Sequence, residues 1–109
     1  MNALDAACDY CHAAPGAPCL SVTGRVCVDP HMPRLDAAGV EVGDWSAAIQ
    51  EYAKNVCELV LGTTSERVVR TARKYRSIDE RAPWVRRLRV AQKAAASRQG
   101  DLFSTISRR

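Results

Sequence analysis

Three cysteines and one histidine stand at short intervals in the first third of this chain of 109 residues. Cys8 and Cys11 are separated by two residues, Cys19 follows after seven more, and His31 after a further eleven. Thiolates and imidazoles surround zinc tetrahedrally when a tight turn brings two donors together and a second local element supplies the other pair. The spacing therefore predicts a zinc site with Cys8, Cys11, Cys19 and His31 as its ligands.

The cysteine count bears on the cellular compartment. The sequence contains five cysteines, an odd number. Residues 1–11 show neither the basic nor the apolar region of a secretory signal, and no stretch is long and apolar enough to span a membrane. We therefore expect a cytoplasmic protein without a membrane partner. In a reducing compartment, metal ligands and buried thiols explain five cysteines better than disulfides do.

Three further residues bear on the ligand set. Cys27 lies in an alternating segment and could replace His31, which would give the four cysteines that iron–sulfur clusters also use. His12 directly follows Cys11, where a surface or supporting role suits it better than coordination. Cys57 lies on an apolar helical stripe, as a buried thiol does. We prefer His31 as the fourth ligand and keep Cys27, a cluster and a metal-free module as alternatives.

The first part of the chain has little helical periodicity. Residues 20–28 alternate around a Thr-Gly turn, which predicts a short β-hairpin. Asp29 and Pro30 suit the N-cap and the first position of a short helix that ends near residue 38. Residues 39–43 break the pattern with a glycine at each end and are the predicted linker.

Residues 44–109 follow the period of a helix, which indicates three helices. The first is expected over 44–62 and the second over 66–76. The third is expected from about residue 79 to 99, because residues 77–80 resemble a capping box, although Pro83 implies a kink or a later start. The apolar stripe of the first helix contains Trp45, Ala48, Ile49, Tyr52, Val56, Leu59 and Val60.

These elements predict a mainly α fold with three domains or segments. A small irregular zinc-binding module, made of a short hairpin and a short helix, occupies residues 1–38. The linker follows at 39–43, and a basic three-helix unit occupies 44–109. With 47% apolar and 26% charged residues, the composition is that of a folded chain rather than a disordered one.

Charge is divided unevenly along the chain. Residues 1–65 carry 3 basic and 8 acidic side chains, whereas residues 66–109 carry 13 basic and 4 acidic ones. A concentrated basic segment is typical of a polyanion partner, although a solvated helix also carries such charges. The candidate DNA contacts on the polar faces of the last two helices are Arg67, Arg70, Arg73, Lys74, Arg86, Arg89 and Lys93. These two helices, joined by a short turn at 76–79, could form a helix-turn-helix-like pair.

The residues around the cysteines carry a more specific resemblance. The string C-x2-C-x-A-x-PG-x-PC, followed by x4-G-x6-H-x2-R, resembles the small zinc-finger module of actinobacterial phages and their hosts. Here it reads Cys8, Cys11, Ala13, Pro15, Gly16, Pro18, Cys19, Gly24, His31 and Arg34. The family more often has proline after the first cysteine and glycine after the second, where this chain has Asp9 and His12. The resemblance covers residues 5–38 and implies a module with three cysteine ligands, one histidine ligand and DNA binding.

We therefore expect a non-enzymatic zinc-finger DNA-binding protein, a phage or actinobacterial regulator, located in the host cytoplasm if a phage encodes it. Zinc with four protein ligands is structural, and the chain has neither a Gly-rich phosphate loop nor a serine nucleophile motif. The alternative is a phage protein that binds a host protein through the acidic first half, with Asp36, Glu41, Asp44, Glu51 and Glu58. A homodimer through the alanine-rich last helix is compatible with either.

Overall fold

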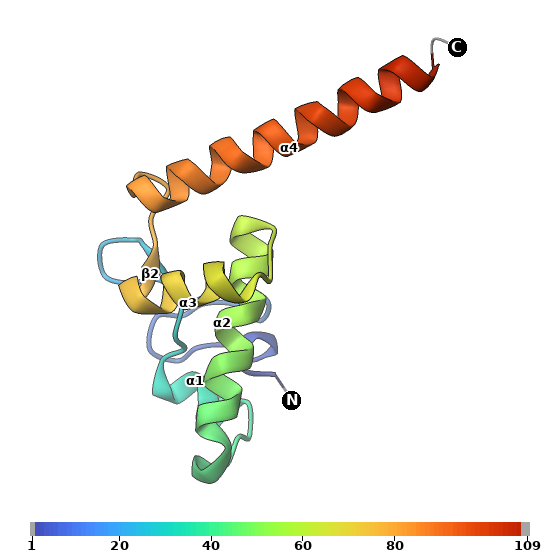
Figure 1. Cartoon of the computed structure of the whole chain (residues 1–109). Helices are drawn as coiled ribbons and strands as arrows, with labels where there is room; N and C mark the ends of the chain where they lie inside the picture. The colour runs from blue at the N-terminus through green and yellow to red at the C-terminus, as the bar shows by residue number, and fades with distance from the viewer. Residues whose placement is uncertain (1, 108–109) are drawn as a thin grey trace. The chain divides into compact units, whose positions relative to one another are not determined.

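The computed structural model describes the backbone of residues 2–107 and the side chains of residues 2–97. Its elements in chain order are η1 (Ala3–Asp5), β1 (Val26–Cys27), α1 (Met32–Ala37), η2 (Val42–Asp44), α2 (Trp45–Leu61), α3 (Glu66–Tyr75), β2 (Ser77–Ile78) and α4 (Pro83–Ser107) (Figure 1). The predicted fold class, mainly α with a small irregular N-terminal cysteine and histidine module, is confirmed. Within the described range, no helix is both long and apolar enough to cross a membrane.

The chain divides into two compact units, Met1–Ile78 and Asp79–Arg109. The predicted division placed a linker at 39–43 between the zinc module and the helices. Part of that segment belongs to η2, and the indole N–H of Trp45 donates to the carbonyl of Val40 over 3.0 Å. Helices α2 and α3 therefore share a unit with the cysteine-rich loops, because contacts between residues distant in sequence hold them together.

Strands β1 and β2 pair antiparallel although about fifty residues separate them, with Val26 opposite Ile78 and Cys27 opposite Ser77. Residues 77–80 were expected to cap a helix, but the first two of them form β2 instead. The predicted hairpin at 20–28 is reduced to a single bridge between Leu20 and Val26. The strand partner of β1 therefore comes from the far end of the unit, where no turn pattern can reveal it.

Helix α2 forms the centre of the first unit and runs along its length in Figure 1. Its buried side chains are Tyr52, Ala53, Val56, Cys57 and Leu61. The predicted apolar stripe is wrong at Leu59, which is 57% exposed, because the buried face is centred on Ala53 and Cys57. The burial of Cys57 is as predicted.

The helix ends also differ from the sequence prediction. Helix α1 begins at Met32 with His31 as its N-cap, later than the predicted cap at Asp29. Helix α4 begins at Pro83, because proline has no N–H to lose in the first turn, and it continues past Gly100, the predicted end. In α3, Ala72 is buried, and Arg76 ends the helix in the left-handed conformation with φ +62°.

Candidate metal centre

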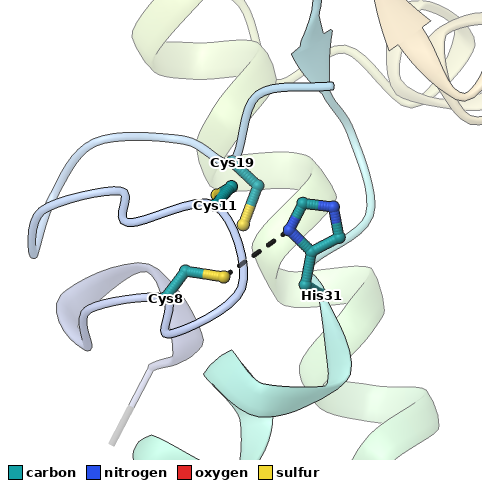
Figure 2. A group of neighbouring side chains, drawn as sticks. All are labelled: Cys8, Cys11, Cys19 and His31. Atoms are coloured by element: carbon teal, nitrogen blue, oxygen red, sulfur yellow. Dashed lines mark hydrogen bonds between the residues drawn. The ribbon is translucent and has the colours of Figure 1, made fainter. Parts of the chain in front are cut away.

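The four predicted ligands converge on one point. One donor atom from each of Cys8, Cys11, Cys19 and His31 lies within 4.8 Å of every other. Figure 2 shows the sulfur of Cys8 facing the imidazole of His31, and this Sγ to Nδ1 distance is 3.5 Å. Donors at tetrahedral zinc, about 2.0 to 2.3 Å from the ion, lie roughly 3.3 to 3.8 Å apart. The Cys8 to His31 distance falls in this range, and the four donors together have the chemistry of a Cys3His zinc site.

A tight turn brings Cys8 and Cys11 together. The backbone N–H of Cys8 donates to the carbonyl of Ala13 over 3.0 Å, which closes the turn. His12 lies inside it with φ +61°, in the left-handed region that glycine adopts without strain. This geometry explains why glycine suits the position after the second cysteine. Here His12 is exposed and stands outside the ligand cluster, as predicted.

The third and fourth ligands are placed by their own local structure. The chain reverses before Cys19 at Gly16, which has φ +85° and donates its N–H to the carbonyl of Leu4 over 2.7 Å. His31 has extended backbone at the N-cap of α1, so its ring projects from the start of that helix toward the cysteines (Figure 2). The exposed ring of Tyr10 packs against this imidazole with 4.6 Å between centroids.

The thiols of the first turn lie in different electrostatic environments. Burial raises the pKa of the Cys8 thiol, and the backbone N–H groups of Cys11 and Tyr10 oppose this effect. Burial acts in the same direction on Cys11, but hydrogen bonds from the N–H groups of Leu20 and Ala13, together with those to Cys8 and His31, outweigh it and lower its pKa to about 6. Backbone donors therefore favour the thiolate that zinc binding requires at Cys11.

Cys27 does not belong to the cluster of four donors. It lies on β1, where burial raises the pKa of its thiol and the charges of Cys19 and Cys11 raise it further. The thiol of Cys57 is buried on α2, and desolvation raises its pKa to about 11. The geometry therefore favours His31 over Cys27 as the fourth donor.

A completely buried arginine supports the site. The Nη1 of Arg34 lies 3.3 Å from Sγ of Cys19. Its Nε donates to the carbonyl of Ala3 over 2.8 Å, and its Nη2 donates to the carbonyls of Leu4 at 2.9 Å and Ala14 at 3.4 Å. Three thiolates and a neutral imidazole around Zn²⁺ carry a net negative charge, which this guanidinium balances.

Tyr52 connects the site to α2. Its buried hydroxyl oxygen accepts the backbone N–H of Cys19 over 2.8 Å, and its ring lies under the guanidinium of Arg34, 5.5 Å from centroid to Cζ. Burial raises the pKa of Tyr52, so the hydroxyl stays protonated. The sequence pattern contained Arg34 three residues after His31 but gave it no role, and Tyr52 was predicted only as a core residue.

The predicted DNA contacts lie on two elements. Four are on α3 in the first unit and three on α4 in the second: Arg67, Arg70, Arg73 and Lys74, then Arg86, Arg89 and Lys93. Arg70 pairs with Glu66 at 3.1 Å, and Arg73 lies 3.8 Å from Asp29. Arg89 is bound to Glu80 at 2.8 Å. The structure thus gathers four of the seven cations on a single helix.

Comparison with known proteins supports the zinc assignment. Residues 1–53 match a family model described as "Putative DNA-binding phage zinc finger domain". The match confirms the predicted resemblance and extends beyond residue 38 into α2 as far as Ala53. No curated protein and no solved structure matches the chain. The match and the Cys3His cluster together fit a phage zinc-binding protein.

Proposed function

We propose that this zinc-binding chain, matched over residues 1–53 by the phage zinc-finger model, is a non-enzymatic DNA-binding regulator. In this proposal the zinc stabilises the fold of the first unit. The basic side chains of α3 and α4 contact phosphates, where they release counterions and position the protein on the duplex.

The observation that carries the proposal is the connection between the zinc module and α3. Strand β1 pairs with β2, which follows α3 directly, and the N–H of Val28 donates to the carbonyl of Arg76 over 3.3 Å. Asp29, two residues before His31, lies 3.8 Å from Arg73 of α3. The segment between the third and fourth zinc ligands thus contacts the end of the most basic helix of the first unit.

The donor set supports a structural rather than a catalytic zinc. Catalytic zinc usually keeps three protein ligands and one open position for water, whereas four protein donors converge here. Two of them, Cys8 and Cys19, are buried. We therefore assign the metal no catalytic step.

The second unit contributes three further basic side chains to the proposed phosphate contacts. Arg86 and Lys93 are exposed on α4, whereas Arg89 is half-buried and held by Glu80 and by the side-chain oxygen of Gln92 at 3.3 Å. Because Arg89 is half-buried as well as paired with Glu80, we expect it to contribute less to phosphate binding than the exposed Arg86 does.

The proposal is tested by the salt dependence of duplex DNA binding. If seven cations each neutralise one phosphate, affinity falls on the order of 10³-fold to 10⁴-fold between about 50 and 200 mM salt. Reversing the charge at Arg86 should weaken binding to all duplex sequences alike. A zinc-loaded chain that retains no duplex even at low salt would refute DNA binding.

The alternative function, binding of a host protein, is favoured by one observation. The five acidic residues proposed for that role, Asp36, Glu41, Asp44, Glu51 and Glu58, are all exposed. They would face a basic patch on the partner. Absence of DNA retention, together with binding of a purified host protein that charge reversal at Glu51 and Glu58 abolishes, would favour this alternative.

A further inference from the structure

We infer that α2 and α3 form a helix-turn-helix in which α3 enters the major groove of duplex DNA and reads base edges. The inference rests on the proposed function, and it names the helix and side chains that would give sequence preference. It also moves the motif from the predicted pair of basic helices to the pair that precedes it.

The connection between α2 and α3 has the geometry of a helix-turn-helix. Helix α2 ends at Leu61, and Gly62 adopts the left-handed conformation with φ +72°, donating its N–H to the carbonyl of Glu58. In the short turn that follows, the N–H of Ser65 donates to the hydroxyl oxygen of Thr63 over 3.1 Å. Helix α3 then runs steeply across α2, with which it is in contact (Figure 1). Two steeply crossing helices joined by a three- or four-residue turn with glycine define this motif.

The pair predicted from the sequence is joined by a longer connection. Helices α3 and α4 are separated by β2 and by residues 79–82, and the boundary between the two compact units falls after Ile78. Helices α2 and α3, in contrast, belong to one unit. The turn and the crossing between α2 and α3 therefore lie within a single compact unit.

The outer face of α3 is basic. Ala72 is completely buried, and the spacing of Arg67, Arg70 and Lys74 places these exposed side chains on the opposite face of the helix. Glu66 holds Arg70 across one turn, with 3.1 Å between the charged groups. A recognition helix contacts bases through its N-terminal part, which here contains Arg67 and Arg70.

The chemistry of these side chains suits base reading as well as phosphate binding. An arginine can donate two hydrogen bonds to O6 and N7 of guanine, and a glutamate can accept from the amino group of cytosine. Arg70 also borders an open groove of about 700 Å³ whose other wall is formed by α2, so its side chain is not packed beneath that helix. We expect Arg67 and Arg70 to select guanine and Lys74 to contact phosphate.

The C-terminal end of α3 is fixed by contacts with the zinc module, as is required of a helix that contacts bases. Arg73, near Asp29, and the carbonyl of Arg76, bonded to Val28, fasten that end to the zinc module. The outward side chains therefore project from an element that is anchored at its far end. Rigid placement is what makes base contacts selective.

The test uses the full chain loaded with zinc and a pool of short random-sequence duplexes. A duplex enriched by selection is compared with its scrambled version, and the ratio of the two affinities is measured. Arg67→Ala and Arg70→Ala are the test variants, and Arg86→Ala and Lys93→Ala on α4 are matched controls that remove the same charge. Zinc content and thermal midpoint are measured for all four variants. Both should match wild type, because exposed positions tolerate alanine.

The inference predicts that each α3 variant lowers the ratio by about tenfold or more. The α4 variants should weaken both duplexes equally and leave the ratio unchanged. Methylation of guanine N7 in the major groove should block binding, whereas methylation of adenine N3 in the minor groove should not.

Four outcomes overturn the inference. If the wild-type chain binds duplex DNA but enriches no sequence, or if the α3 and α4 variants behave alike, α3 does not read bases, although the proposed function stands. If interference occurs only at adenine N3, the helix is not in the major groove. If no duplex is retained at low salt, the proposed function fails together with the inference.

Discussion

The guanidinium of Arg34 lies 3.3 Å from the sulfur of Cys19, and neither residue is exposed to solvent. The same guanidinium donates to the carbonyls of Ala3 and Leu4 in η1, the segment before Cys8. A buried charge is stable only when it is paired and hydrogen-bonded, so the thiolate cluster and Arg34 depend on each other. The zinc site is therefore a network that includes the N-terminal segment and α1.

Replacing this arginine should destabilise the first unit. Arg34→Met keeps much of the volume but removes the charge and the donors to Ala3 and Leu4, which we expect to lower the free energy of unfolding by about 3 to 5 kcal/mol. Arg34→Lys should recover only part of the loss, because lysine lacks the planar fork. Denaturant unfolding of the zinc-loaded chain measures this, with Arg67→Met as the exposed control. Equal stability of both methionine variants would contradict the account.

The hydroxyl of Tyr52 has a specific acceptor role at Cys19. Tyr52→Phe leaves the buried N–H of Cys19 without a partner, which should cost about 1 to 3 kcal/mol and weaken zinc binding. Tyr10→Phe removes an exposed hydroxyl near the same site and should change neither property. Competition with a zinc chelator, followed for both variants, gives the affinity. A Tyr52→Phe variant that holds zinc as tightly as wild type would exclude this role.

The left-handed backbone at His12 predicts a stabilising substitution. Glycine adopts φ +61° without the clash that a Cβ atom causes. His12→Gly should therefore raise the free energy of unfolding by roughly 0.5 to 1 kcal/mol and raise the thermal midpoint with it. Ala13→Gly, at the neighbouring position, should lower it, because that residue does not have positive φ. Calorimetry of the two zinc-loaded variants decides between these signs, and a loss of stability in both would show that the turn is unstrained.

Acid should release the metal through the thiolates. Because the pKa of Cys11 falls from an ordinary value of 9.0 to about 6, the stability from its ionisation is complete above pH 9 and is lost as pH falls through about 6. Bound zinc competes with protons and shifts the loss lower still. A zinc indicator should report release only below about pH 6. Release that is already complete at neutral pH would contradict the thiolate environment described here.

The ligands could be predicted from the sequence because the turn at Cys8 and Cys11, the reversal before Cys19 and the helix cap at His31 are each formed locally. The hydrogen bond from Cys19 to Tyr52 could not be predicted, because 33 residues separate the two. The position of Tyr52 in the helical pattern fits any apolar core residue. Arg34 was visible in the motif, but only burial shows that its charge faces a thiolate.

The same distinction applies to the fold. Helices α2 and α3 follow from local periodicity, and their bounds agree with the prediction within a residue or so. Strand β2 does not, because Ser77 and Ile78 resemble a helix cap locally and become a strand only by pairing with β1. The boundary between the two compact units falls after Ile78, at the end of β2.

Metal analysis of purified variants tests the central claim most directly. The account predicts one zinc per chain in the wild type and in Cys27→Ser, and loss of zinc together with folding of the first unit in Cys8→Ser, Cys19→Ser and His31→Ala. A full zinc content in Cys19→Ser, or loss of zinc in Cys27→Ser with retention in His31→Ala, would contradict the Cys3His site.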